Sequence, residues 1–156
     1  MKFVHYIILA VGLGVLTLGQ TQPQQSQPDP QTQHTEAKWR IVNYWSEWCA
    51  PCRREIPMLN ALNETLSSTN VTIVGVNFDE DSREVTLAIA KGMGVDFPTL
   101  TRDVVSKLEL RAPDVLPTTY ILSPDNKIVA KLIGEQTRES LQAQLASLGL
   151  PVVTND

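Results

Sequence analysis

Residues 39–52, WRIVNYWSEWCAPC, decide the fold, because a short hydrophobic segment ends in two cysteines three positions apart. Residues 39–45 are largely β-branched and aromatic, which predicts a central buried strand. Residues 50–66 then place apolar side chains every three or four positions, which predicts a helix with one buried face. Cys49 and Cys52 are therefore expected at a junction between a strand and a helix.

Strand and helix segments alternate over the rest of the chain. Further strands are predicted at 71–77, 118–122 and 127–133, further helices at 81–91, 104–110 and 137–148, and a short extended piece at 97–100. Asp81 and Glu84 form a predicted capping box at the start of the second helix. The separator SPDN predicts that the last two strands form an antiparallel hairpin. This order predicts an α/β fold with a mixed central sheet of about four strands, helices on both faces and an α-containing insert.

The N-terminal part of the chain differs in composition from the rest. Residues 1–19 place Lys2 before an apolar run, which is typical of an export signal and lies at the lower length limit for a membrane-spanning helix. Both an uncleaved membrane anchor and a cleaved signal peptide fit this segment. Residues 20–37 predict a disordered Gln/Pro-rich linker, ahead of a domain at 38–150 and a tail at 151–156. Lys2 favours a domain outside the cytoplasm, where disulfides form.

The charge and the supply of metal ligands narrow the classes of function. A net charge of −4, with acidic and basic residues interspersed, provides no basic surface for nucleic acid. A structural zinc site needs four ligands, usually Cys or His, and the chain from residue 38 onward has two cysteines and no histidine. His5 and His34 both precede this segment. We therefore expect no nucleic acid, no metal and no cofactor.

Two other roles remain for the cysteine pair: a static structural disulfide and a redox-active pair. A bridge across so short a loop removes little entropy from the unfolded chain, so it would stabilise the fold only slightly. At the start of a helix, free amides and the helix dipole favour a thiolate on Cys49. Cys52, one turn further along, can attack a mixed disulfide on Cys49 and release the partner. The pattern favours a redox-active Cys49–Cys52 disulfide with Cys49 as the nucleophile.

The motifs together resemble the thioredoxin superfamily, in particular its TlpA/ResA/DsbE-like branch of membrane-anchored, extracytoplasmic thiol-disulfide oxidoreductases. The resemblance runs from Lys38 to Leu148 and is carried by YWSEWCAPC, CRREIPML, VGVNFDED, VDFPTL and LPTTYILSPDNKIV. It implies a thioredoxin fold and dithiol–disulfide exchange with partner proteins through Cys49 and Cys52. Reduction is the implied direction, as in cytochrome c maturation, with a membrane dithiol donor that restores the reduced pair.

Two alternatives to a reductase stay open: a disulfide oxidant or isomerase, and a thioredoxin-fold module that binds peptides without catalysis. We expect a monomer at the periplasmic or another extracytoplasmic face. An uncleaved N-terminus would tether it to the membrane, whereas cleavage of the signal would leave it soluble.

The resemblance assigns a role to a second segment, VLPT at residues 115–118. Pro117 matches a cis-proline that packs beside the cysteines in this family. Leu116 would then offer backbone hydrogen bonds to an extended substrate segment, a form of strand addition. The alternative is an ordinary trans proline at the first residue of a strand.

Glu55, three residues after Cys52, matches an acidic residue that this branch uses near its active site. At this spacing Glu55 lies on the same helical face as Cys52, and burial would raise its pKa so that it could exchange a proton with Cys52. The alternative is an exposed glutamate that pairs with a nearby arginine. Asn43 stands where ordinary thioredoxins carry a buried aspartate, which makes Glu55 the candidate acid–base group.

Trp48 and Pro51 complete the candidate substrate-binding residues, together with Leu116 and Pro117. Trp48 matches the aromatic residue before the first cysteine, where it would shield Cys49 and touch the partner; a plain core tryptophan is the alternative. Pro51 lies between the cysteines and affects the relative stability of the thiolate. This branch usually begins with an extra hairpin before the first central strand. The linker runs almost to that strand here, so we expect a minimal four-stranded sheet.

Overall fold

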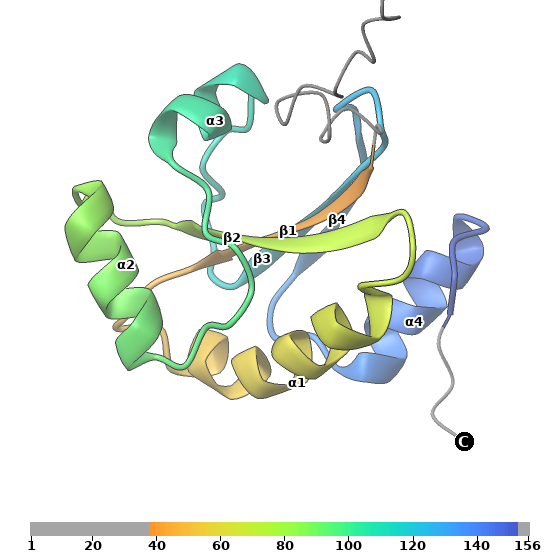
Figure 1. Ribbon diagram of the computed structural model, residues 1–156, viewed down its shortest axis with the longest axis horizontal. Coiled ribbons are helices and arrows are strands. Elements are labelled where there is room, and N and C mark those ends of the chain that lie inside the picture. The colour runs from red at the N-terminus through yellow and green to blue at the C-terminus, as the bar shows by residue number, and fades with distance from the viewer. Residues whose placement is uncertain (1–37, 153–156) are drawn as a thin grey trace, which may run out of the picture. The chain divides into compact units, whose positions relative to one another are not determined.

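A computed structural model of the chain describes residues 38–152 (Figure 1). The anchor or signal predicted at 1–19, the linker predicted at 20–37 and most of the predicted tail lie outside the described residues. Within the described range, no helix is both long and apolar enough to cross a membrane.

The elements follow the order predicted for the domain. They are β1 (Trp39–Trp45), α1 (Ala50–Leu66), β2 (Val71–Asn77), α2 (Arg83–Gly92), α3 (Arg102–Lys107), β3 (Thr118–Leu122), β4 (Ile128–Ile133) and α4 (Arg138–Ser147). The extended piece at 97–100 is also present, since Thr99 forms an isolated parallel bridge with Gly75 of β2.

The predicted N-cap of α2 lies one residue too early. The N-cap is Ser82, whose hydroxyl accepts a hydrogen bond from the backbone N–H of Val85. Asp81 does not cap the helix, because its carboxylate instead accepts from the side-chain amide of Asn77 at 3.0 Å. A serine and an aspartate are both good N-caps, so the choice between them depends on this contact with Asn77 at the end of β2.

The predicted start of α3, by contrast, is two residues too late, because the helix begins at Arg102 rather than at Val104. Thr101 is the extended N-cap residue, and its carbonyl accepts from the N–H groups of Val104 and Val105. The polar first turn carries no apolar periodicity, which is why the sequence pattern misses it.

The sheet has four strands in the order β2-β1-β3-β4. β1 runs parallel to β2 and antiparallel to β3, and β3 and β4 form the predicted antiparallel hairpin. The prediction of a mixed four-stranded sheet is thus confirmed for the described residues. Asn43, near the centre of β1, lies opposite Gly75 of β2 and Thr119 of β3.

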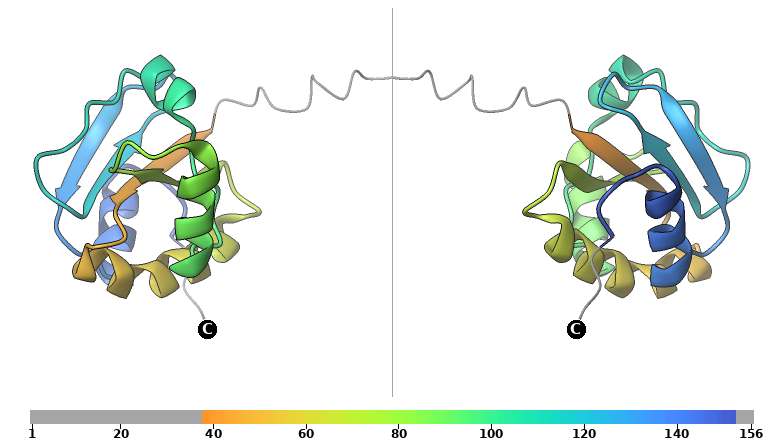
Figure 2. Two further views of the ribbon diagram at one scale, coloured as in Figure 1. Left: turned by 90° about the vertical axis from the view of Figure 1, so that its left-hand side faces the viewer. Right: turned by 90° about the vertical axis from the view of Figure 1, so that its right-hand side faces the viewer.

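Helices cover both faces of the sheet, as predicted. Figures 1 and 2 show α1 and α4 on one face and α3 on the other. Alternate β1 residues face opposite ways: Ile41 packs in the core beneath α1 and α4, whereas Val42 packs in the core on the α3 side. A third cluster, formed by Trp45, the two cysteines and Ala90 of α2, lies where β1 passes into α1.

Candidate active site

The two cysteines lie at the junction of β1 and α1, where the sequence places them. Cys49 is the N-cap of α1, with an extended backbone, and its Sγ accepts a hydrogen bond from the Cys52 backbone N–H at 3.3 Å. The pair forms a disulfide, with Cα atoms 5.3 Å apart. Cys52 is fully buried, whereas 4% of Cys49 is exposed, and Pro51 between them is half-buried. Helix amides and the dipole would stabilise a thiolate on Cys49 after reduction.

The Leu116–Pro117 peptide bond is cis, so the alternative of a trans proline is wrong. Leu116 packs against the cluster that contains Trp45 and both cysteines, which brings this segment to the disulfide. Pro117 is buried, and its carbonyl accepts a hydrogen bond from the backbone N–H of Gly134 at 2.9 Å.

Glu55 is the one buried carboxyl group among residues 38–152, with 2% of the residue exposed. The alternative of an exposed glutamate paired with an arginine is therefore wrong. Its Oε1 accepts from Asn43 Nδ2 at 2.7 Å, and its Oε2 accepts from the backbone N–H of Gln136 at 2.8 Å. Burial raises the pKa of Glu55 to about 7, and these two hydrogen bonds oppose part of that rise. A group with this pKa can take up and release a proton at neutral pH.

Asn43 supports Glu55 from the centre of the sheet. Its buried Nδ2 group donates to Glu55 Oε1 and also to Thr119 Oγ1, at 3.1 Å. A neutral amide at this position leaves Glu55 without a second buried carboxylate nearby, so no like-charge repulsion from β1 adds to its pKa. Asn43 is thus a neutral partner of the acid–base candidate.

Trp48 is exposed over 65% of its surface, so the alternative of a core tryptophan is wrong. Its indole Nε1 donates to both carboxylate oxygens of Asp79, at 3.2 and 3.1 Å, and its ring meets Phe78 edge to face with centroids 6.3 Å apart. Ser46 donates its hydroxyl to Asp79 as well. These contacts hold the ring against Phe78 and Asp79, which follow β2.

Asp79 and Ser46 are not among the site residues expected from the sequence. A signal was available, since Asp79 follows β2 and Ser46 follows β1. The carboxyl ends of adjacent parallel strands lie at the same edge of a sheet, and side chains that follow such strands gather there. Strand prediction plus the parallel pairing of β1 and β2 would have brought the two residues together.

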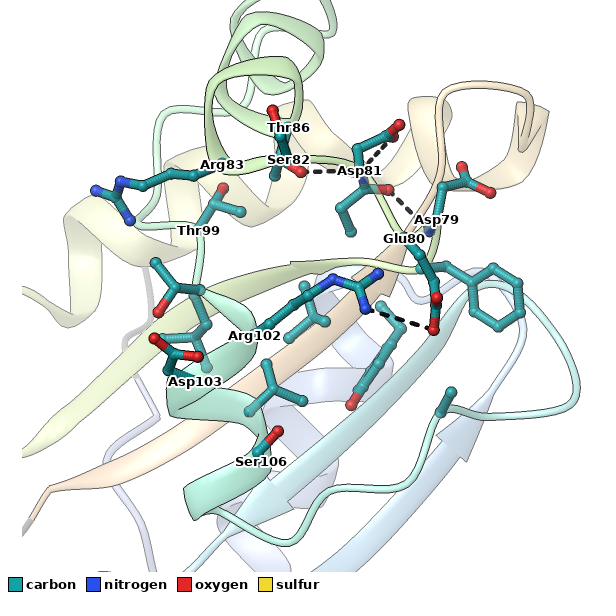
Figure 3. A pocket seen from close by; sticks show the side chains of 18 of the residues that line it. Asp79, Glu80, Asp81, Ser82, Arg83, Thr86, Thr99, Arg102, Asp103 and Ser106 are labelled. Carbon is teal, nitrogen blue, oxygen red and sulfur yellow. Dashed lines mark hydrogen bonds and ion pairs between the residues drawn. The ribbon is translucent and has the colours of Figure 1, made fainter.

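A cleft of about 430 Å³ lies next to this edge, between the β2–α2 loop and α3. Figure 3 shows Arg102 of α3 reaching Glu80 of the loop, an ion pair of 3.4 Å. Asp79, which holds Trp48, is part of the cleft lining. The cleft is large enough for a small ligand or a peptide side chain, and no sequence pattern predicted it.

No group of three or more His, Cys, Asp or Glu side chains that could hold a metal ion occurs within residues 38–152. The candidate site therefore consists of the disulfide, the Leu116–Pro117 peptide, the buried Glu55 with Asn43, and the exposed Trp48 with Asp79. The arrangement is suited to thiol–disulfide exchange with a protein partner.

The chain is similar to proteins of known family and fold. The chain is 30% identical over 113 residues to the thiol-disulfide oxidoreductase ResA of Bacillus cereus, a match that covers 72% of this chain and 65% of the relative, just under two thirds of its length. Among solved structures, StoA of Bacillus subtilis matches with a TM-score of 0.56 and 25% identity, covering 67% of this chain and 80% of its own.

A DsbF homologue of Corynebacterium diphtheriae matches with a TM-score of 0.57 and 29% identity, covering 71% of this chain and 72% of its own. These likenesses confirm the thioredoxin fold. The model of the AhpC/TSA family matches residues 20–131, which is more than half of the sequence, and the chain therefore belongs to the AhpC/TSA family, with the thioredoxin fold.

Proposed function

We propose that the chain is an extracytoplasmic thiol-disulfide oxidoreductase that exchanges electrons with partner proteins through Cys49 and Cys52. The observation that carries this proposal is the disulfide at the N-terminus of α1, with a buried carboxyl one helical turn beyond it. Thiol-disulfide oxidoreductase is also the name given to the matching ResA of Bacillus cereus.

The exchange begins from the reduced pair. The Cys49 thiolate attacks a sulfur of the substrate disulfide, forms a mixed disulfide and releases one substrate thiolate. Cys52 then loses its proton and attacks Cys49 Sγ, which closes the Cys49–Cys52 disulfide and releases the second substrate thiolate. The substrate gains two electrons, and the two substrate thiolates take up protons. A dithiol donor, which we place in the membrane, restores the reduced pair by the reverse steps.

Glu55 is the proposed acceptor of the Cys52 proton. The two residues are three positions apart on α1 and are both buried, so they share one face of the helix. A carboxyl group with a pKa of about 7 is about half ionised at neutral pH, so its ionised form can accept the thiol proton and become neutral.

The substrate is proposed to dock across the exposed Trp48 and the Leu116–Pro117 peptide, with Pro51 beneath it. An extended substrate segment can pair with the backbone of Leu116 by strand addition. Trp48 offers a large, rigid aromatic surface of the kind that anchors protein interfaces. We propose that one protomer is sufficient for this docking.

Reduction is the proposed direction, as in the maturation of cytochrome c, and it is supported by the resemblance to the ResA-like branch. Equilibration of the full chain with glutathione tests the direction. We expect a potential near that of reducing thioredoxins, roughly −270 mV, whereas strong disulfide oxidants lie near −120 mV. A potential close to that of the oxidants would favour the oxidant or isomerase alternative over the reductase.

The proposed location outside the cytoplasm is supported by Lys2 and the apolar run that follows it. The same segment would tether the domain to the membrane, with residues 20–37 as the spacer. Separation of the membrane and soluble fractions of cells that express the full chain distinguishes the tether from a cleaved signal.

Asp79→Ala is expected to weaken exchange with protein substrates about fivefold in kcat/KM, since Trp48 loses a charge-assisted hydrogen bond of roughly 1 kcal/mol in value at an exposed site. The loss should appear in KM for insulin, while reduction of the small disulfide of glutathione stays near the wild-type rate. Glu80→Ala is the matched control, because Glu80 is the next residue and its carboxylate pairs with Arg102 rather than with Trp48. Equal losses for both substrates would contradict a docking role for Trp48.

A further inference from the structure

Two neighbouring residues of α1 hold two neighbouring residues of the loop between β4 and α4. Glu55 accepts the backbone N–H of Gln136, and Arg54 pairs with the side chain of Glu135. The first contact is buried and the second faces solvent, with 61% of the Arg54 side chain and 35% of the Glu135 side chain exposed. The pairing holds this loop against the acid–base candidate at two successive points.

The buried contact depends on the position of the loop and not on the side chain of Gln136, because the donor is a backbone amide. The loop itself is folded tightly: Gly134 has a positive φ of 88°, and Gln136 Nε2 donates to the Gly134 carbonyl at 2.9 Å. Any shift of the loop would therefore move the amide away from Glu55 without changing the chemical groups present.

The solvent-facing contact has the geometry needed to fix that position. Arg54 Nε and Nη2 both donate to Glu135 Oε2, at 2.9 and 2.6 Å, and Nε also reaches Oε1 at 3.2 Å. An exposed ion pair contributes little to global stability. A multidentate guanidinium–carboxylate pair nevertheless fixes both distance and orientation.

The same loop touches the proposed substrate-docking peptide. The Gly134 N–H donates to the Pro117 carbonyl at 2.9 Å, two residues before the Gln136 amide that reaches Glu55. Thus Gly134 and Gln136 of one loop contact Pro117 on one side and the acid–base carboxyl on the other.

We propose that Arg54 and Glu135 form a clamp that positions the Gln136 amide on the Glu55 carboxylate, and that both are positioning residues for thiol exchange. This inference rests on the proposed role of Glu55 as the proton acceptor of Cys52. A hydrogen bond to the ionised carboxylate favours that form, so the clamp keeps the pKa of Glu55 from rising further.

The charge of Glu135 and its role in the clamp act on Glu55 in opposite directions. Its negative charge raises the pKa of Glu55, whereas the amide that it holds in place lowers it. The other side chains that meet Glu55 from the sheet are neutral, namely Asn43 of β1 and, through it, Thr119 of β3, and Cys52 on α1 is held in the disulfide. Removal of the Glu135 carboxylate therefore shows which effect is larger. The pKa of Glu55 rises if the lost hydrogen bond dominates, and it falls if the lost charge dominates.

The test is a ¹³C NMR titration of the Glu55 carboxyl in the oxidised full chain in detergent, with the signal assigned from Glu55→Gln. In Glu135→Ala we expect the pKa of Glu55 to rise by about one unit, because loss of a hydrogen bond to a charged group outweighs the removal of a screened surface charge. The double variant Arg54→Glu with Glu135→Arg rebuilds the pair in reverse and should return the pKa toward the wild-type value.

Arg53→Ala is the matched control, since Arg53 is the preceding arginine on the same helix and pairs with Glu47 instead of the loop. Its Glu55 titration should match the wild type. An unchanged or lower pKa in Glu135→Ala would overturn the clamp. Hydrogen exchange of the Gln136 amide is a second measurement: it should accelerate in Glu135→Ala and not in Arg53→Ala, and equal rates would also overturn the clamp.

The titration requires no turnover, so its outcome is independent of the proposed function. If Glu135→Ala leaves the titration unchanged while Glu55→Gln still slows exchange, the clamp fails and the oxidoreductase stands. If the titration shifts as expected while Glu55→Gln exchanges normally, the clamp stands and the proton-acceptor role of Glu55 fails.

Discussion

Cys49→Ser is expected to reduce insulin no faster than dithiothreitol alone, whereas Cys52→Ser is expected to accumulate a covalent mixed disulfide with its partner. The difference follows from the site, because Cys49 caps α1 and retains some exposure while Cys52 is fully buried behind it. Without Cys49 no attacking thiolate reaches the substrate. Without Cys52 the attack occurs, but the second step that releases the substrate does not.

Non-reducing electrophoresis followed by mass spectrometry identifies the trapped partners and the cysteine that holds them. The trapped bond should map to Cys49 in Cys52→Ser, and the double serine variant should trap nothing. If Cys49→Ser traps no partner yet restores a deletion strain fully, the site is the peptide-binding module that remains the alternative. If the bond maps to Cys52 in Cys49→Ser at equal yield, the assigned order of attack is wrong.

Glu55→Gln is expected to remove a large pH dependence of stability. The pKa of Glu55 is about 7 in the folded chain, against an ordinary value of 4.5. Between these two pH values the folded state binds more protons than the unfolded state, so the free energy of unfolding falls as the pH rises. The total loss from this group is about 3 kcal/mol, absent below pH 4.5 and complete above pH 7.

Urea unfolding of the oxidised protein at intervals from pH 4 to pH 8 measures this slope. The wild type should lose stability as the pH rises, and Glu55→Gln should lose about 3 kcal/mol less over the same range. Glu64→Gln, on an exposed part of the same helix, should keep the wild-type slope. Equal slopes in wild type and Glu55→Gln would mean that the carboxyl ionises in the folded chain as it does in the unfolded chain.

The same variant tests the proton-acceptor role. In single-turnover exchange at neutral pH, we expect the release of substrate from the Cys49 mixed disulfide to slow roughly a hundredfold, the usual contribution of a positioned acid–base group. The first attack by Cys49 should change little, because its thiolate is stabilised by the helix N-terminus and not by Glu55. Equal slowing of both steps would point to a structural defect.

The sequence alone predicted the elements and the reactive pair, because those features depend on local patterns. Strand and helix periodicity located β1 and α1 to the residue, and SPDN predicted the β3–β4 hairpin. Two cysteines at a strand-to-helix junction need no tertiary information to be identified as a candidate nucleophile and its partner. The family resemblance added Pro117, and its cis bond is confirmed.

Only the tertiary structure decided which alternatives held for single side chains. Glu55 could be exposed or buried, and it is buried because Gln136, from a loop 81 residues later, and Asn43 of β1 close over it. Trp48 could be core or surface, and Asp79, which follows β2, holds it outside. A local pattern predicts which face of an element is apolar, but the burial and pKa of a side chain depend on segments far apart in the chain. The local sequence WSEWCAPC therefore predicts the chemistry of Cys49 and Cys52. The proposed transfer of the Cys52 proton depends instead on how the chain folds around Glu55.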